Sequence, residues 1–212
     1  TVTVTLSGFV GSETLTYTNA SSFNNKNVGT GKTVTVNSIT LTDGNNGGLA
    51  SNYSVTPGQT TTANIAAKAL TISGITASSK TYDGNTSATL DTSSVLYTGL
   101  ISGDTFNGSY SGAFGNANVG TAKTVTITPS YTGADVSNYD ITDQTSTTAD
   151  ISAKALTATA SVSNKTYDAT NSATATLSIS GLVGSETLSA TNTSTFNNKN
   201  VGTGKTVTAN SI

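Results

Sequence analysis

Few residue types in this chain of 212 residues can do chemistry, and they limit the reactions that need to be considered. The chain contains nine lysines and eleven acidic residues, but no arginine, histidine or cysteine. Catalytic triads based on histidine or cysteine, zinc fingers, iron–sulfur clusters, haem ligation and disulfide frameworks are therefore excluded. No paired carboxylates or other acid–base constellation stands out. We expect no catalytic residues, no enzyme activity, and no bound cofactor or metal.

Two lysines begin the same motif, Lys-Thr-Tyr-Asp, at Lys80 and Lys165. Such a lysine could form a Lys–Asn isopeptide crosslink, but that reaction needs a buried acid beside the pair. The chain has only two glutamates, Glu13 and Glu186, and most of its aspartates lie in turn sequences. A structural role for both lysines is therefore the better interpretation.

Two further sequences resemble fragments of known binding loops. Residues 43–48, Asp-Gly-Asn-Asn-Gly-Gly, lack the alternating acids and terminal glutamate of a calcium loop, so we interpret them as a turn. The Gly-Thr-Gly-Lys at 29–32 and 202–205 lacks the full spacing of a phosphate-binding loop. Thr-x-Thr strands also occur in ice-binding solenoids, but here they recur too rarely to form a flat array.

Charge and hydropathy exclude two classes of partner. The net charge is −2, and the chain has no arginine, so a surface that follows nucleic-acid phosphates is not expected. No apolar run approaches the roughly 20 residues of a membrane-spanning helix, so we expect no membrane insertion. The first residues, Thr-Val-Thr-Val-Thr-Leu-Ser-Gly, do not have the pattern of a signal peptide.

The elements that must position these residues are repeated along the chain. The motifs Ser-Asn-Tyr and Ala-Lys-Ala-Leu-Thr each recur 86 residues apart, at 51–53 and 137–139 and at 67–71 and 153–157. We therefore predict three repeat units, of which the first is incomplete at its N-terminal end and the third at its C-terminal end: 1–68, 69–154 and 155–212. Because both ends of the sequence fall inside units, we expect a piece of a longer protein.

Within each unit, apolar residues alternate with threonine. Examples are Val34 and Val36, Leu70 and Ile72, and the pair Val125–Ile127. A period of two is typical of half-buried antiparallel strands, and β-branched residues favour them. We predict an all-β fold with less than about 5% helix, in which each repeat of about 86 residues is an immunoglobulin-like antiparallel sandwich.

Each unit places one phenylalanine shortly before an Asn-Val-Gly-Thr sequence. We predict that these rings anchor the core, and the alternative is an aromatic platform for a ligand. The glycine of each sequence is expected to sit in a turn with positive φ. The residues are Phe23, Phe114 and Phe196, with Gly29, Gly120 and Gly202.

Tyrosines recur in the Lys-Thr-Tyr-Asp and Ser-Asn-Tyr motifs. We predict that each caps a sandwich with a buried ring and a hydrogen-bonded hydroxyl, as in a tyrosine corner, and sugar binding is the alternative. The four residues are Tyr53, Tyr82, Tyr139 and Tyr167.

The joints between units are short and contain neither glycine nor proline. We place them at Lys68 with Leu70 and at Lys154 with Leu156, and we expect each leucine to be buried against a neighbouring unit. A joint without a flexible linker favours a stiff, extended rod.

Four motifs in order resemble the YDG and MBG-type repeats of large bacterial exoproteins, which are similar to filamentous-haemagglutinin-like adhesins and biofilm-matrix proteins. They are Lys-Thr-Tyr-Asp-Gly-Asn-Thr at 80–86, Asn-Val-Gly-Thr-Ala-Lys-Thr-Val-Thr at 118–126, Ser-Asn-Tyr at 137–139 and Ile-Ser-Ala-Lys-Ala-Leu-Thr at 151–157. The third copy departs from this pattern, because Ala169 replaces the glycine.

The resemblance implies bacterial immunoglobulin-like sandwiches repeated in tandem as a stalk or spacer in a secreted or cell-surface protein that acts in cell adhesion or biofilm structure. It transfers no catalytic residues. The alternatives are a module that binds carbohydrate or cells, and a fibre subunit that assembles end to end or by strand exchange. The expected partners are neighbouring repeats, other copies of the chain in a fibre, and surface glycans.

Overall fold

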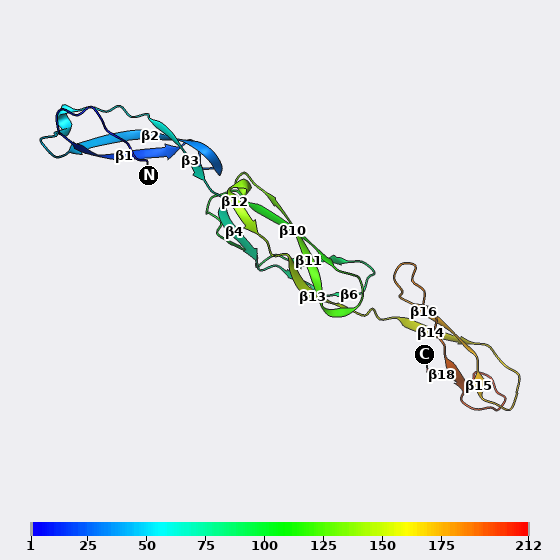
Figure 1. Ribbon diagram of the computed structural model, residues 1–212. Coiled ribbons are helices and arrows are strands. Elements are labelled where there is room, and N and C mark those ends of the chain that lie inside the picture. The colour runs from blue at the N-terminus through cyan, green and yellow to red at the C-terminus, as the bar shows by residue number, and fades with distance from the viewer. Residues whose placement is uncertain (1, 212) are drawn as a thin grey trace. The chain divides into compact units, whose positions relative to one another are not determined.

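The computed structural model describes residues 2–211, and the chain is all-β (Figure 1). Strands account for 48% of the chain and helix for 3%, which confirms the expected near absence of helix. The helical residues form two single 3₁₀ turns, η1 (Ala50–Asn52) and η2 (Val136–Asn138).

Eighteen strands are defined in the described residues, and most of them are short. They are β1 (Leu15–Phe23), β2 (Gly29–Asp43), β3 (Thr60–Ile65), β4 (Lys68–Ser73), β5 (Thr76–Ala77), β6 (Lys80–Thr81), β7 (Ser87–Ala88), β8 (Leu90–Asp91), β9 (Leu96–Thr98), β10 (Asn107–Phe114), β11 (Gly120–Thr132), β12 (Tyr139–Thr142), β13 (Ser146–Ser152), β14 (Thr157–Val162), β15 (Ser172–Ala173), β16 (Ala175–Ser180), β17 (Thr193–Phe196) and β18 (Val207–Ser211).

Contacts divide the chain into two compact units that do not follow the repeats. Unit 1 comprises residues 2–74, Val95–Ser109 and Pro129–Gln144. Unit 2 comprises Ile75–Ser94, Tyr110–Thr128 and residues 145–211. The middle repeat contributes to both units, because its long strands β10 and β11 run through both. The repeat boundaries themselves stay predictions.

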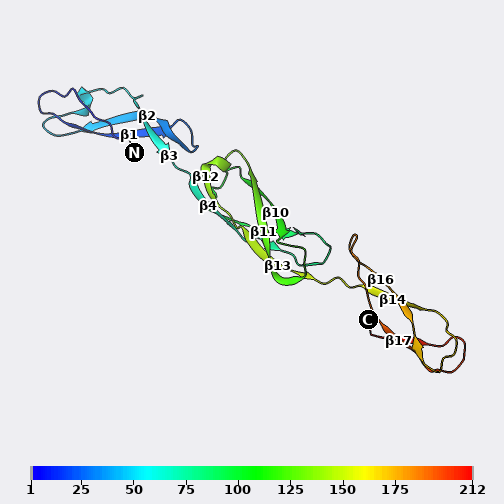
Figure 2. The same ribbon diagram turned by 45° about the vertical axis from the view of Figure 1, so that its right-hand side comes forward.

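The first repeat contains one three-stranded antiparallel sheet in the order β1-β2-β3. These strands lie side by side in both views (Figure 1) (Figure 2). β1 pairs with β2 from Leu15 opposite Asp43 to Phe23 opposite Val34. Residues 2–9 are extended beside this sheet and form no strand ladder in the described chain.

The middle repeat contains sheets in the orders β12-β4-β9, β5-β8 and β6-β13-β11-β10-β7. Two of its strand pairs are parallel, β4 with β12 and β6 with β13, whereas the sequence analysis predicted antiparallel strands throughout. The cause is topological: strands from the start of the repeat lie beside strands from its end and run in the same direction. Alternation reports which face of a strand is buried, but not the direction of its neighbour.

The third repeat contains two smaller sheets, β14-β16 and β15-β17-β18. β14 pairs with β16 in the same register in which β4 pairs with β9, because Thr157 opposite Ser180 corresponds to Thr71 opposite Thr98. All six residues of β14 are exposed. The third repeat is therefore built on the plan of the middle repeat, but with less of its strand surface covered.

The buried residues are those that the alternation points inward. Side chains of Leu70, Ile72, Val125 and Ile127 are at most 4% exposed, and Val36 is 2% exposed. Their neighbouring threonines lie on the other face of each strand, as a period of two requires. The interior positions of these strands therefore follow directly from the sequence.

A backbone bulge follows the Asn-Val-Gly sequence in the first and middle repeats, and the position of the positive φ angle differs from the prediction. The register shifts between Gly29 and Lys32 in β2, and in the same way in β11. Positive φ occurs at Gly31 (60°) and Ala122 (48°), two residues after the predicted glycines Gly29 and Gly120. Gly202 likewise is not the strained position, since positive φ falls at Gly204. The chain needs the left-handed conformation where the extra residue leaves the ladder.

Ala122 occupies a conformation that favours glycine, so Ala122→Gly is expected to stabilise the middle repeat by about 1 kcal/mol. The Ala122 N–H donates to Asp150 Oδ1 at 2.7 Å, and glycine retains this bond. The free energy of unfolding measured in urea checks the prediction. The control, Ala113→Gly within β10, should instead destabilise by about 0.5–1 kcal/mol, and the same sign for both variants would contradict the strain argument.

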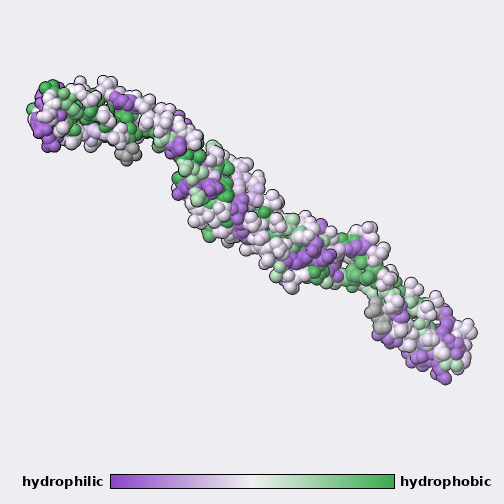
Figure 3. Space-filling model, in the orientation of Figure 1, coloured by the Kyte–Doolittle hydropathy of each residue, from purple (hydrophilic) through white to green (hydrophobic). Residues whose placement is uncertain are grey.

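Threonine and serine dominate the surface. Together they supply 74 of the 212 residues, and Figure 3 shows mostly pale atoms of intermediate hydropathy with smaller green and purple areas. Neither 3₁₀ turn approaches the length or the apolar character that a membrane-crossing helix requires.

Candidate functional site

The three repeated phenylalanines are buried to different extents. Phe114 is 3% exposed and packs with Val125, Ala149 and Ile151. Phe196 is half-buried, and Phe23 is 38% exposed, so Phe23 does not form the predicted core anchor. Phe114 lies in β10, which has β11 on one side and β7 on the other, whereas β1, which carries Phe23, pairs only with β2 among the described residues. Burial of the ring therefore depends on strands that the phenylalanine position itself does not reveal.

The repeated tyrosines also have different surroundings. Tyr139 is buried, and its hydroxyl donates to Asp104 Oδ2 at 2.7 Å and accepts from the Ile101 N–H at 3.0 Å. Tyr53 is half-buried, and its hydroxyl donates to Glu13. Tyr167 is 55% exposed, which differs from the predicted buried ring.

The lysine of the Lys-Thr-Tyr-Asp motif closes the local turn. Lys80 Nζ lies 2.8 Å from Asp83 Oδ1 and from the Asn85 carbonyl oxygen, and 5.6 Å from the centroid of the Phe114 ring. The Asp83 side chain is 45% exposed, so the buried acid that an isopeptide reaction needs is not provided here. In the third copy, Lys165 lowers the pKa of Asp168 to about 2 through the same ion pair.

Three acids occupy equivalent positions in the repeats, and the tyrosine hydroxyls bind them. Glu13, Asp104 and Glu186 are 91 and 82 residues apart, which are the same offsets that separate Phe23, Phe114 and Phe196. Tyr53 donates to the first acid and Tyr139 to the second. In the first and middle repeats, the acid is thus held by the Ser-Asn-Tyr tyrosine of the same repeat.

Aromatic packing fixes the tyrosine that holds Asp104. The Phe106 ring centroid lies 5.1 Å from that of Tyr131, 5.7 Å from Tyr97 and 6.0 Å from Tyr139. Such edge-on and tilted contacts stabilise a defined ring orientation. The Tyr139 hydroxyl, and with it Asp104, is therefore held in one place.

A second acid is brought beside Asp104 by the turn that precedes η2. Asp135 is 7% exposed, and its Oδ2 accepts from the Thr105 N–H at 2.9 Å. The close approach of these backbones depends on Gly133, where φ is +137° and an added Cβ would lie 2.1 Å from the Thr105 carbonyl oxygen. Asp104 and Asp135 therefore form a fixed acidic pair at one end of the middle repeat.

Lys26 of the first repeat binds this acidic pair. Its Nζ lies 2.7 Å from Asp104 Oδ1 and 2.8 Å from Asp135 Oδ1. The lysine side chain is 64% exposed, whereas each aspartate side chain is 10% exposed. Two nearly buried carboxylates thus share one cation that comes from a different repeat, and all three groups lie within unit 1.

The charges of this cluster shift its pKa values in opposite directions. Hydrogen bonding from Lys26 lowers the pKa of Asp104 and of Asp135 below the ordinary value of 3.8, and the hydroxyl of Tyr139 lowers that of Asp104 further. The same two carboxylates raise the pKa of Lys26. All three groups are therefore charged at neutral pH.

Backbone contacts accompany the ion pairs. The Val28 N–H donates to Asn138 Oδ1 at 2.9 Å, and Asn138 Nδ2 lies 3.4 Å from Asn27 Oδ1. Asn138 belongs to η2 and precedes the Ser-Asn-Tyr tyrosine. The loop Asn25–Val28 of the first repeat is therefore bound by both charge and hydrogen bonds to the middle repeat.

The equivalent boundary between the second and third repeats has another chemistry. Ala117 stands where the first repeat has Lys26, so the loop has no cation there. Instead, the Tyr82 hydroxyl donates to Glu186, the counterpart of Asp104. Tyr82 packs against the Phe114 core cluster of its own repeat, as predicted for a capping ring, while its hydroxyl contacts the next repeat.

The predicted joint residues are only partly placed as expected. Leu70 is fully buried, but it lies in β4 opposite Ile141 of its own repeat. Leu156 is 40% exposed, which contradicts its predicted burial against a neighbour. Lys68 and Lys154 are both exposed. The contact between repeats is therefore made by loops far along the chain from the joint.

Sequence analysis did not identify Lys26, Asp104, Asp135 or Asn138. The one available signal was that an acid recurs at Glu13, Asp104 and Glu186. Nothing in the sequence pairs that position with a loop of the preceding repeat.

Residues 2–211 contain no group of three or more acidic side chains that could hold a metal ion. In the predicted turn at 43–48, Asp43 Oδ1 accepts from the Ala50 N–H at 2.6 Å. This carboxylate therefore stabilises the loop itself.

The chain matches one known family. The family model described as "YDG domain" matches three successive segments, residues 1–63, 66–148 and 152–212. No curated protein and no solved structure matches the chain.

Proposed function

Since the chain belongs to the YDG domain family, we propose that it is a noncatalytic stalk or spacer in a large secreted or cell-surface bacterial adhesin or biofilm-matrix protein. In this role, each repeat holds its neighbour in a preferred direction and so projects other parts of the protein away from the cell. The partners that this function needs first are the neighbouring repeats themselves.

One observation carries the proposal: the binding of Lys26 to Asp104 and Asp135. A spacer needs restraint between repeats, and this contact supplies it without a catalytic group. The two acids are fixed before the lysine binds, by Tyr139 and by the Thr105 N–H. Less conformational freedom is therefore lost on binding than if all three side chains were mobile.

The restraint is expected to be modest and sensitive to salt. Because 64% of the Lys26 side chain is exposed, mobile ions can reach the pair. The hydrogen bond from Val28 to Asn138 is uncharged and should persist at high ionic strength. The joint should therefore loosen, but not separate, as salt is added.

The test measures the distribution of distances across this joint. Because the chain has no cysteine, spin labels can be placed uniquely at Thr40→Cys and Thr132→Cys, which are exposed strand positions of the first and middle repeats. We expect a narrow distribution by pulsed electron paramagnetic resonance, and Lys26→Ala should broaden it. Lys199→Ala removes the corresponding lysine of the third repeat and should leave it unchanged.

The same distance measurement at low pH provides a second test of the proposal. Asp104 and Asp135 have lowered pKa values in the fold, so their attraction to Lys26 is complete above their ordinary pKa of about 4. This attraction is lost as pH falls through the lowered values and the carboxylates become protonated. The distance distribution of the native chain should therefore broaden below pH 4. Equally broad distributions for the native chain at neutral pH and for Lys26→Ala would refute the spacer proposal.

A further inference from the structure

The glycine of the Tyr-Asp-Gly turn in the middle repeat lies against the third repeat. Gly84 has a φ of +77°, and a Cβ added to it would lie 2.9 Å from Val183 Cγ1. Carbon atoms in contact are usually about 3.5–4.0 Å apart, so either the turn or Val183 would have to move. Both residues belong to unit 2. The missing side chain at Gly84 therefore lets the two repeats meet at this point.

The fold of the turn itself does not require this glycine. In the third repeat, Ala169 occupies the corresponding position with a φ of +63°. Both turns are closed by the same hydrogen bond, from the backbone N–H two residues after the aspartate to its Oδ1, and both aspartates, Asp83 and Asp168, bind the lysine three residues before at 2.8 Å. Because alanine adopts this turn, the close approach of Val183 is the better explanation of Gly84.

The tyrosine of the same turn contacts two repeats with two parts of its side chain. The Tyr82 ring packs against the core cluster around Phe114, whereas its hydroxyl donates to Glu186 of the third repeat. The hydrogen bond to Glu186 raises the pKa of Tyr82 above its ordinary value of 10.0, so the hydroxyl keeps its proton at neutral pH. The ring therefore stabilises its own repeat, and the hydroxyl binds the next one.

Val183 and Glu186 are the two ends of one turn in the third repeat. The Glu186 N–H donates to the Val183 carbonyl oxygen at 3.1 Å, and Glu186 Oε2 accepts from the Val183 N–H at 3.2 Å. Gly184, between them, has a φ of +59°. The turn thus presents an apolar side chain and a carboxylate together, and these meet Gly84 and the Tyr82 hydroxyl.

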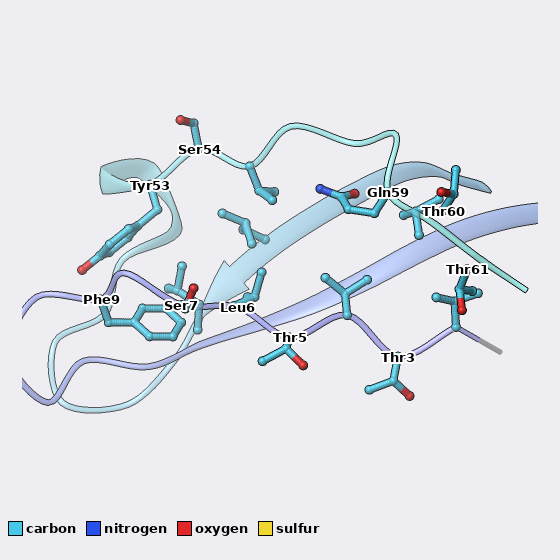
Figure 4. A pocket seen from close by; sticks show the side chains of 16 residues that line it. Thr3, Thr5, Leu6, Ser7, Phe9, Tyr53, Ser54, Gln59, Thr60 and Thr61 are labelled. Carbon is cyan, nitrogen blue, oxygen red and sulfur yellow. The ribbon is translucent and has the colours of Figure 1, made fainter. Parts of the chain in front are cut away.

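The first repeat contains the same turn sequence, and there too it accepts a tyrosine hydroxyl. Residues 10–13 are Val-Gly-Ser-Glu, as are residues 183–186. The Tyr53 hydroxyl donates to Glu13 and accepts from the Val10 N–H at 3.1 Å. The Tyr53 ring packs edge-on against Phe9, with the two ring centroids 5.8 Å apart (Figure 4). Both copies of this turn therefore bind a tyrosine, in one case from the same repeat and in the other from the preceding repeat.

One acid can serve its own repeat and the preceding repeat at the same time. Asp104 accepts from Tyr139 of its own repeat through Oδ2 and from Lys26 of the preceding repeat through Oδ1. A carboxylate has about four sites for hydrogen bonds, so these interactions do not compete. Glu186 is the counterpart of Asp104, and the group that it receives from the preceding repeat is the Tyr82 hydroxyl.

We propose that the Tyr-Asp-Gly turn at 82–84 is a docking surface for the following repeat, and that it accepts the turn at 183–186. The Tyr82 hydroxyl binds the carboxylate, and the bare backbone of Gly84 accommodates Val183. This inference rests on the proposed spacer function, because it supplies the restraint between repeats at the second boundary. The donor is an uncharged hydroxyl, so this contact should be less sensitive to salt than the ion pairs of Lys26.

Spin labels across the second boundary test the hydroxyl contact. Thr126→Cys and Ser178→Cys place them at exposed strand positions of the middle and third repeats. We expect a narrow distance distribution by pulsed electron paramagnetic resonance, and Tyr82→Phe should broaden it. The phenylalanine ring stays in the core, so hydrogen exchange of the β11 amides should not change. Tyr167→Phe, the matched control in the third repeat, should leave the distribution narrow. A native distribution that is already broad, or one that Tyr82→Phe does not alter, would overturn the proposal.

Gly84→Ala tests the steric contact in the same labelled chain. Because alanine adopts this turn at position 169, the middle repeat should stay folded with unchanged exchange of the β11 amides, while the distance distribution broadens. Adding Val183→Ala removes Cγ1 and leaves Cβ, which would lie 3.9 Å from the new Cβ, so the distribution should narrow again. Unfolding of the middle repeat by Gly84→Ala, or no recovery with Val183→Ala, would show that the glycine serves its own turn and would contradict the proposal.

The two boundaries can be tested separately. Lys26→Ala should leave the distribution between positions 126 and 178 unchanged, and Tyr82→Phe should leave the distribution between positions 40 and 132 unchanged. Broadening by Lys26→Ala at the first boundary, without any effect of Tyr82→Phe at the second, would reject the docking surface and retain the spacer proposal.

Discussion

Phe114→Ala is expected to lower the free energy of unfolding of the middle repeat by about 3–5 kcal/mol, the usual cost of deleting a buried phenylalanine. Phe114 is 3% exposed and is surrounded by Val125, Ala149 and Ile151. Deleting its ring leaves a cavity that the paired strands β10 and β11 cannot close without moving. The ring also supports Lys80, whose Nζ lies 5.6 Å from the ring centroid.

The matched control for this variant is Phe23→Ala. Phe23 holds the equivalent place in the first repeat but is 38% exposed, so its removal should cost about 1 kcal/mol. Urea unfolding, monitored by hydrogen exchange of the β11 amides, directly measures the loss of stability in the middle repeat. Similar losses in the two variants would show that exposure does not govern their contributions, and an unchanged middle repeat in Phe114→Ala would favour the ligand-platform alternative.

Much of the fold could be predicted because strand alternation is a local property. Val34 and Val36 are interleaved with threonine, and both are buried as that pattern requires. The same reasoning failed for Phe23 and Leu156, which have buried counterparts in the middle repeat but are 38% and 40% exposed. Burial depends on both the orientation of a side chain and the presence of a neighbour, and the sequence pattern reports only the orientation.

The candidate site could not be predicted, for a different reason. Lys26 and Asp104 are 78 residues apart, and they meet because two loops from different repeats come together. Ala117 at the equivalent position of the next repeat shows that the lysine is not part of the repeat pattern. A motif search finds what the repeats share, whereas this contact depends on a residue in which they differ.

Leu70→Ala and Leu156→Ala together test whether the covering strand determines the energetic role of a repeated residue. The two leucines occupy the same place in the repeated Ala-Lys-Ala-Leu-Thr sequence. Leu70 is fully buried, so its truncation should cost about 2–5 kcal/mol. Leu156 is 40% exposed, and its truncation should cost about 1 kcal/mol or less.

The difference between these two leucines should be visible in the strand that covers one of them. β12 pairs in parallel with β4, with Ile141 opposite Leu70, so Leu70→Ala should accelerate hydrogen exchange of the β12 amides and lower the urea midpoint of the middle repeat. Leu156→Ala should leave both quantities unchanged. If the two substitutions cost the same, the repeated sequence rather than the covering strand would determine stability.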